Sequence, residues 1–342
     1  MLPLGCAFLA LAPTPPPGGI ELPPGPAADA AARIAPDTEP AALPAIPEDA
    51  WSRPATWKRF AELLSAEARG AAPDPSRRAE LALLALAQRR WEDAWARFAD
   101  CAASPAIAAA LLPRFLPGAA KGDLPADGAV LAPALPPLVP GGPEIPRGAV
   151  QRRAMKIDAL AVGQVKLSLK VSVEGEGVEI DVEHLSGGAA KLAISIPEHP
   201  EFGYADEYVD WIHQEARGVA HEVTVAPGDE VHTLYARFEP RRAEWPTRLP
   251  ASLPAQIEHG TVWLDPGPGG EDRALLESVA ECLSAGPLRL AARIGAPRGE
   301  KEEGIGIRID LSHRAERPRK LAWIAGALEE RALARPPAAK PH

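Results

Sequence analysis

The chain has 342 residues, a net charge of −9 at pH 7 and a pI near 5.5. Its length suits two or three domains, and hydrophobic residues, 46% of the total, suffice for buried cores. Lys and Arg are interspersed with acids, and the tight basic cluster is confined to residues 317–320. Duplex binding needs concentrated positive charge, so we do not expect a nucleic-acid partner. No stretch approaches the 18 or so consecutive apolar residues of a transmembrane helix, so none is expected.

The N-terminal segment 1–12 is apolar and resembles a signal peptide. It ends in Ala10-Leu11-Ala12, the small-x-small pattern that signal peptidases read. No Lys or Arg precedes it, and Pro13 follows. A misassigned start codon or an unstructured apolar start are the alternatives, and the pattern favours export over a cytoplasmic location. Residues 13–50, rich in Pro and Ala and without helical or strand period, predict a disordered segment.

Residues 51–116 predict a small helical module. Trp57, Phe60, Leu63 and Leu64 form one apolar stripe on a first helix. Proline and glycine then separate three further amphipathic segments, which predict helices over about 76–88, 91–103 and 105–112.

The segment 91–105 carries the most specific pattern of the chain. Trp91, Ala94, Phe98 and Cys101 occupy the spacing of small and aromatic residues in the second helix of a tetratricopeptide repeat, which this segment resembles. The helix before it fits less well, because no aromatic residue stands near position 85. The resemblance implies a scaffold for protein contacts; an ordinary four-helix cluster is the alternative. We expect Trp91→Ala to destabilise this module and to leave the following domain folded.

Residues 117–150 predict a Pro/Gly-rich linker, after which the hydrophobic period changes to two. Strands are expected over 165–173 and 178–182, joined by a turn at 174–177, and over 192–196. Two further strands, 222–225 and 231–238, predict a second hairpin around the Pro-Gly-Asp turn. Together these elements predict an antiparallel β-sandwich over residues 151–245.

The two stretches VEIDVEHLSGGAAKLAISIP (178–197) and VTVAPGDEVHTLYARF (223–238) resemble bacterial immunoglobulin-like or fibronectin-like accessory domains. The rest, 255–335, predicts a small α+β unit or an extension of the sandwich. Its expected strands are 259–264, 288–294 and 305–311, and its expected helices are 271–285 and 318–334. The expected fold class is therefore a multidomain α + β protein: a repeat-like helical module, a linker, a β-sandwich and a C-terminal α+β part.

The best candidate for chemistry is the polar segment Tyr204–His221. If it is helical, Asp206, Asp210 and His213 share one face, and His221 could approach from the following strand. These four residues are the candidate metal ligands, with Glu207 and Glu215 nearby in sequence. A solvated acidic surface helix is the alternative interpretation.

No other segment of the sequence matches a motif for catalysis or ligand binding. Residues 265–270 form a Gly/Pro-rich loop before a helix, but no Lys or Thr follows and the acids 271–272 would repel phosphate. No GxSxG or CxxC motif is present, and neither a catalytic residue nor a cofactor is expected. Of the three cysteines, Cys101 and Cys282 could pair, although they fall in different expected domains.

The sequence thus predicts a non-catalytic bacterial protein for protein–protein interaction or a structural, accessory role. The alternative is a metal-dependent enzyme or hydrolase with its site around Asp206–His221.

Overall fold

The structure is a computed structural model of the chain. It describes, in chain order, residues 20–35, 37–47, 49–68, 74–115, 128–131, 133–136, 150–162, 164–175, 177–196, 202–215, 219–240, 261–267, 272–285, 290–295, 307–313 and 316–333. The expected signal peptide at 1–12 lies outside these residues. Among them, no helix combines the length and the apolar character needed to cross a bilayer.

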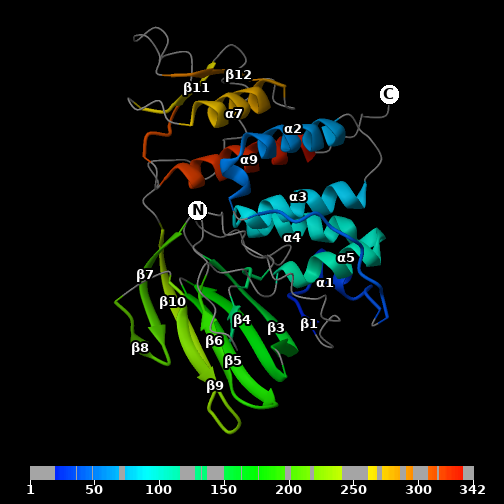
Figure 1. Cartoon of the computed structure of the whole chain (residues 1–342), viewed down its shortest axis with the longest axis vertical. Coiled ribbons are helices and arrows are strands. Elements are labelled where there is room, and N and C mark those ends of the chain that lie inside the picture. Colours follow the sequence, from blue (N-terminus) through cyan, green and yellow to red (C-terminus); the bar gives the residue numbers. More distant parts are fainter. Residues whose placement is uncertain are drawn as a thin grey trace, which may run out of the picture.

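The fold combines helices with antiparallel and parallel sheets. In Figure 1 the C-terminal strands lie at the top, most of the helices in the middle and the large sheet at the bottom. The helices expected from hydrophobic periodicity are present. Those that begin at residues 54, 75 and 105 start with proline, and Asp74 accepts a hydrogen bond from the Ser76 amide. The helices are α1 (Pro26–Ala31), α2 (Pro54–Ala68), α3 (Pro75–Ala87), α4 (Trp91–Asp100), α5 (Pro105–Leu111), α7 (Arg273–Ala285) and α9 (Arg317–Leu333).

The large sheet has seven strands in the order β1-β3-β4-β5-β10-β7-β8, and every adjacent pair in it is antiparallel. Its strands are β1 (Ile20–Glu21), β3 (Val150–Val162), β4 (Val165–Gly175), β5 (Gly177–Ser186), β7 (Phe202–Val209), β8 (Ile212–His213) and β10 (His232–Pro240). The expected hairpin at 174–177 is confirmed, because Glu174 pairs with Gly177 and Gly175 takes a positive φ of 58°.

A second sheet, β2-β6-β9, has three strands and makes the strand region sandwich-like. Its strands are β2 (Gly128–Leu131), β6 (Ala190–Ile194) and β9 (His221–Val225). The predicted hairpin between 222–225 and 231–238 is wrong: β9 pairs with β6, whereas β10 lies between β5 and β7 in the large sheet. The Pro-Gly-Asp turn therefore carries the chain from one sheet to the other.

One hydrophobic core joins both of these sheets to helices α1, α3, α4 and α5. Alternating residues of β4 and β5, such as Leu169 and Ile180, are fully buried in it together with Trp95 and Phe98 of α4. The expectation that Trp91→Ala would leave the strand region folded is therefore corrected, because Trp91 belongs to the same continuous core.

The segment 13–50, expected to be disordered, contains β1 and α1 in its described part. Ala27 and Ala30 are buried, and the amide of Ala41 donates to the carbonyl of Ala106. Prolines here do not prevent structure: one of them occupies the first turn of α1.

The expected linker 117–150 also carries structure. Its described residues include β2, an edge strand, and the buried residues Ala134 and Leu135. The indole of Trp95 donates to the carbonyl of Leu135 at 2.7 Å, which fixes this segment against α4. Edge strands tolerate neighbouring prolines, which explains why proline density misled the prediction.

A second core builds the C-terminal part around a parallel sheet in the order β12-β11-β13. Its strands are β11 (Thr261–Asp265), β12 (Ala291–Ile294) and β13 (Ile307–Asp310), and α7 and α9 pack on it. Helix α2 supplies Trp57, Phe60 and Leu64 to this same core, so it packs with segments roughly 200 residues later in the chain. Figure 1 shows α2 lying beside α9 and below α7.

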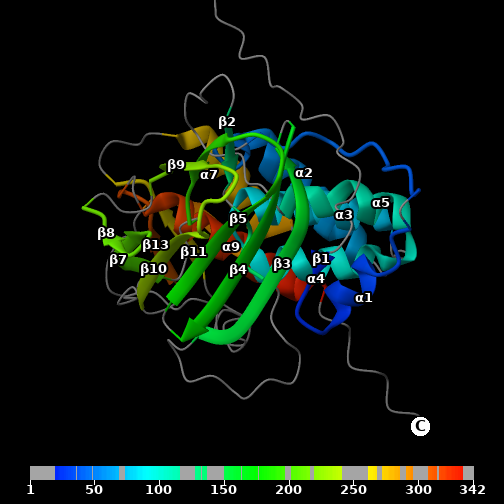
Figure 2. The same cartoon turned by 90° about the horizontal axis from the view of Figure 1, so that it is seen from below.

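Helix α3 is shared by the two cores. Leu81 and Leu84 face the C-terminal core, whereas Ala82 and Ala85 face the core of the strand region. The C-terminal part therefore does not build its core from residues 255–335 alone. It is completed by an N-terminal helix. Viewed from below, the large sheet crosses in front of the helices (Figure 2).

Candidate functional site

The segment Tyr204–His221 lies at one edge of the large sheet and is not a helix. Residues 202–209 form β7, residues 210–211 form a tight turn, and β8 returns along β7 with Val209 opposite Ile212. Asp206, Asp210 and His213 therefore do not share a helix face, and that part of the prediction is wrong.

Two of the candidate residues lie on the outer face of the sheet. Asp206 accepts from Arg237 on the neighbouring strand β10, at 2.5 Å from Nη2 and 2.9 Å from Nε. His213 Nε2 lies 3.8 Å from Asp206 Oδ1, and its ring packs edge-on against Tyr208. Asp206 is thus occupied by an arginine, which suits an ion pair better than a metal site.

Asp210 holds the tip of the hairpin. One carboxylate oxygen accepts from the Thr233 amide at 2.9 Å, and the other lies 2.9 Å from His232 Nδ1. The Asp210 amide in turn donates to the Thr233 carbonyl at 2.8 Å. These contacts fasten the turn to β10.

His221 contacts Glu207, whose side chain lies on the inner face of the large sheet. Glu207 is fully buried on the inner face of β7, and His221 Nε2 on β9 lies 3.1 Å from Glu207 Oε1. The pair bridges the large and the small sheet. The four candidate ligands therefore divide between separate contacts, and among the described residues no group of three His, Cys, Asp or Glu side chains could hold a metal ion. Glu215 is exposed beyond β8.

The hairpin tip presents two large apolar side chains to solvent. Trp211 is 69% exposed and Ile212 is 68% exposed. Both turn residues, Asp210 and Trp211, have positive φ angles of 48° and 65°, a conformation that Trp adopts rarely. Exposed apolar groups gathered on one protruding element are typical of interaction sites.

An aromatic cluster continues from this tip onto the outer face. The Trp211 ring stacks on Tyr235 with centroids 6.1 Å apart, and Tyr235 also contacts Tyr208. Tyr235 reaches across to β5, where its ring fills the space above Gly177: a Cβ there would come within 2.7 Å of it. Any side chain at Gly177 would displace the ring.

Two carboxylates on β5 border these rings. Glu179 pairs in register with Tyr235, and Asp181 pairs with Thr233, whose hydroxyl donates to it at 2.9 Å. Partial burial, and after it the charge of Asp181, raises the pKa of the Glu179 carboxyl above its ordinary value. Trp211, Tyr208, Tyr235 and Glu179 escaped the sequence prediction. The outward alternation of Thr233, Tyr235 and Arg237 on one strand was the available signal.

The residues of the repeat-like pattern lie elsewhere, in the protein interior. Trp91, Ala94 and Phe98 on α4, and Cys101 directly after it, are all buried. Burial raises the pKa of the Cys101 thiol to about 12, and that of Cys282 likewise to about 12. Both cysteines are free, and they belong to different cores, so the open alternative of a pairing between them is not realised.

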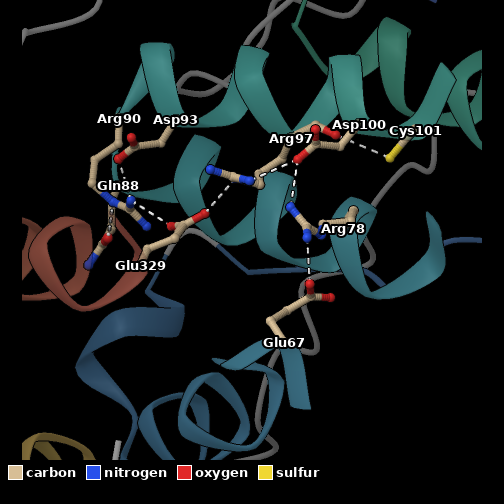
Figure 3. Close-up of polar contacts among 9 residues, drawn as sticks. All are labelled: Glu67, Arg78, Gln88, Arg90, Asp93, Arg97, Asp100, Cys101 and Glu329. Atoms are coloured by element: carbon tan, nitrogen blue, oxygen red, sulfur yellow. Dashed lines mark hydrogen bonds and ion pairs between the residues drawn. The ribbon is translucent and has the colours of Figure 1, made fainter. Parts of the chain in front are cut away.

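The polar face of α4 carries a buried ion network toward the C-terminal part (Figure 3). Glu329 on α9 lies between Arg90, 2.8 Å away, and Arg97, 3.1 Å away. A second branch runs from Arg78 on α3 to Glu67 on α2 at 2.5 Å. The network joins the two halves of the molecule, and its charges pair with one another.

The described residues at either end of the Gly/Pro-rich segment after β11 make polar contacts. Asp265 accepts from the Gly267 amide at 2.9 Å, and Arg317 pairs with Asp272. These contacts agree with a structural loop.

Comparison with known proteins gives no assignment: no family model, no curated protein and no solved structure matches the chain.

Proposed function

We propose that this is a non-catalytic protein that binds a protein partner through the hairpin β7–β8. The observation that carries the proposal is the exposure of Trp211 and Ile212, consecutive residues at the tip of a hairpin that Asp210 fastens to β10. Partner-binding surfaces favour such exposed aromatic anchors on a rigid support.

The helical part contributes structure to this proposal rather than a second binding surface. In α3 and α4 the apolar positions are buried in the two cores. We propose that α3 and α4 form a single repeat-like helix pair that lies between the two cores. An immunoglobulin-like or fibronectin-like origin of the strand region is part of the same proposal, supported by its two-sheet arrangement and strand alternation.

The test begins with purification of the tagged full-length protein and its associated proteins from the source organism. A candidate partner is then purified and its binding measured by calorimetry. We expect saturable binding that is lost in Trp211→Ala and Ile212→Ser. Leu185→Ser is the matched control, because Leu185 is another exposed apolar residue, 44% exposed, on strand β5. Binding that persists in both hairpin variants would overturn the proposal.

The same preparation tests the alternative of a metal-dependent enzyme at Asp206–His221. Its metal content is measured for the native protein and for Asp210→Ala and His213→Ala. Stoichiometric metal that is lost on these substitutions would contradict the non-catalytic proposal.

A further inference from the structure

The surface around Trp211 combines aromatic rings with negative charge. We define the aromatic–acidic surface as Trp211, Tyr208, Tyr235, Glu179, Asp181 and Asp206. These residues come from four chain segments, β5, β7, the turn after β7, and β10, which the register of the large sheet brings side by side. It is a continuous patch and not a set of scattered residues.

The rings of this surface supply one half of a cation-binding arrangement. Trp211 is mostly exposed, and its ring stacks on Tyr235. Tyr208 stands directly opposite Tyr235 in the sheet register. Electron-rich ring faces attract ammonium and guanidinium groups, with Trp the strongest of the aromatic side chains.

The carboxylates supply the other half. Directly opposed residues on adjacent antiparallel strands have Cβ atoms about 4.5–5.5 Å apart, so Glu179 and Tyr235 are neighbours on the same face of the sheet. Asp181 is two residues along the same face, with Lys170 3.4 Å away, and Asp206 is already paired with Arg237. At the hairpin tip Asp210 and the exposed Asp229 add further negative charge beside His232.

Charge complementarity therefore selects the occupant. In residues 165–240 acids outnumber Lys and Arg about threefold, and a cation placed against Glu179 and Asp181 would relieve their mutual repulsion. An acidic partner would be repelled by the same groups.

We infer that the aromatic–acidic surface binds a Lys- and Arg-bearing segment of the partner protein, with a guanidinium or ammonium group between the Trp211 ring and the Glu179–Asp181 carboxylates. This inference rests on the proposed function and specifies the chemistry of the partner.

The experiment measures fluorescence anisotropy of a labelled Gly-Arg-Gly-Lys repeat peptide titrated with the full-length protein. We expect saturable binding that weakens with added salt, and that weakens about tenfold in Trp211→Ala and in the double variant Glu179→Gln/Asp181→Asn. A Gly-Glu repeat peptide of equal length should not bind. Glu222→Gln, which removes an exposed acid from β9 of the other sheet, is the matched control and should change nothing.

Several results would overturn the inference. Equal loss in Glu222→Gln, or no loss in Trp211→Ala, would mean that the peptide responds to overall charge and not to this surface. Saturable binding of the Gly-Glu peptide would contradict the charge argument. Far-UV circular dichroism of each variant checks that the fold is kept.

A purified partner separates this inference from the proposed function. A partner that needs the hairpin but binds through a segment without Lys or Arg would refute this inference and leave the proposed function standing. A partner whose binding does not depend on the hairpin would refute the proposed function itself.

Discussion

Arg90 Nη1 and Glu329 Oε2 lie 2.8 Å apart although 239 residues separate them in the chain. Both side chains are almost completely buried, at 7% and 1% exposure. Burial alone would lower the pKa of Arg90, but the Glu329 and Asp93 carboxylates raise it above its ordinary value. Arg90 therefore stays charged inside the protein, and its contact with Glu329 depends on the two halves of the chain being together.

We predict that Glu329→Gln destabilises the protein by about 3–5 kcal/mol, because it leaves the buried charges of Arg90 and Arg97 without their shared carboxylate. Guanidinium denaturation followed by circular dichroism measures the change. Asp49→Asn, which breaks the exposed pair with Arg53, is the control and should cost less than about 1 kcal/mol. Equal costs for the two variants would show that the buried network contributes no more than a surface pair.

Trp91→Ala should cost about 3–5 kcal/mol, because it removes a large buried side chain from the core that α4 shares with both sheets of the strand region. We expect the strand and helix signals of circular dichroism to shift together to lower denaturant. Trp211→Ala, at the exposed hairpin tip, should stay within about 0.5 kcal/mol of the parent. Strand signals that keep their original midpoint would show that helices and sheets unfold independently.

The two buried thiols should be unreactive in the native state. With pKa values raised to about 12 by burial, Cys101 and Cys282 hold almost no thiolate at about pH 8. In a Cys6→Ser variant, Ellman's reagent should therefore detect neither cysteine until denaturant is added, and then both. Rapid native labelling of either thiol would contradict the burial of that core.

Glu179 should make a small pH-dependent contribution to stability. Its folded pKa is raised, so the folded state holds the proton more tightly than the unfolded chain. Stability from this group is present at low pH and is lost as pH rises from the ordinary value of 4.5 through the raised one. Asp181 and Glu174 raise this pKa and Lys170 lowers it.

Glu179→Gln should consequently raise the unfolding free energy at about pH 7 by a few tenths of a kcal/mol, with the gain shrinking at about pH 4. Urea denaturation at the two pH values measures it, with Glu222→Gln as the control. A gain that is larger at the lower pH would reverse the assigned sign.

The hydrophobic pattern of the sequence predicted most helices and strands, but it did not predict which of them pack against each other. The stripe Trp57, Phe60 and Leu64 predicted α2, but nothing within 20 residues of it indicates that its partners are α7, β11 and α9. Proline density predicted unstructured segments where β1, α1 and β2 form, because a short edge strand or a Pro-started helix needs few residues. The mixed α and β fold with a large antiparallel sheet was predictable, whereas the assignment of strands to sheets was not.

The candidate site shows the same limit. Asp206, Asp210 and His213 fit a helical face by spacing, yet β7 sends Glu207 to the core and Asp206 to the surface. A two-residue turn is usually signalled by Gly at its second position, and here that position is Trp211. Because Trp211 stands where such a turn usually has Gly, the sequence did not indicate a hairpin. Trp211 is also the residue that we propose to bind the partner.

The placement of α2 has a consequence for how the protein is made. Trp57 and Phe60 leave the ribosome close in time to Trp51 and α3, but well before the C-terminal strands and helices that complete their core, the first of which begins at Thr261. At about 5–20 residues per second, roughly 200 residues take tens of seconds to synthesise, and during that time these aromatic rings lack the part of their native core that α7, α9 and β11 supply. We therefore expect the nascent chain to be prone to aggregation until its last helix emerges, and a chain that ends before α7 to leave Trp57 and Phe60 incompletely buried.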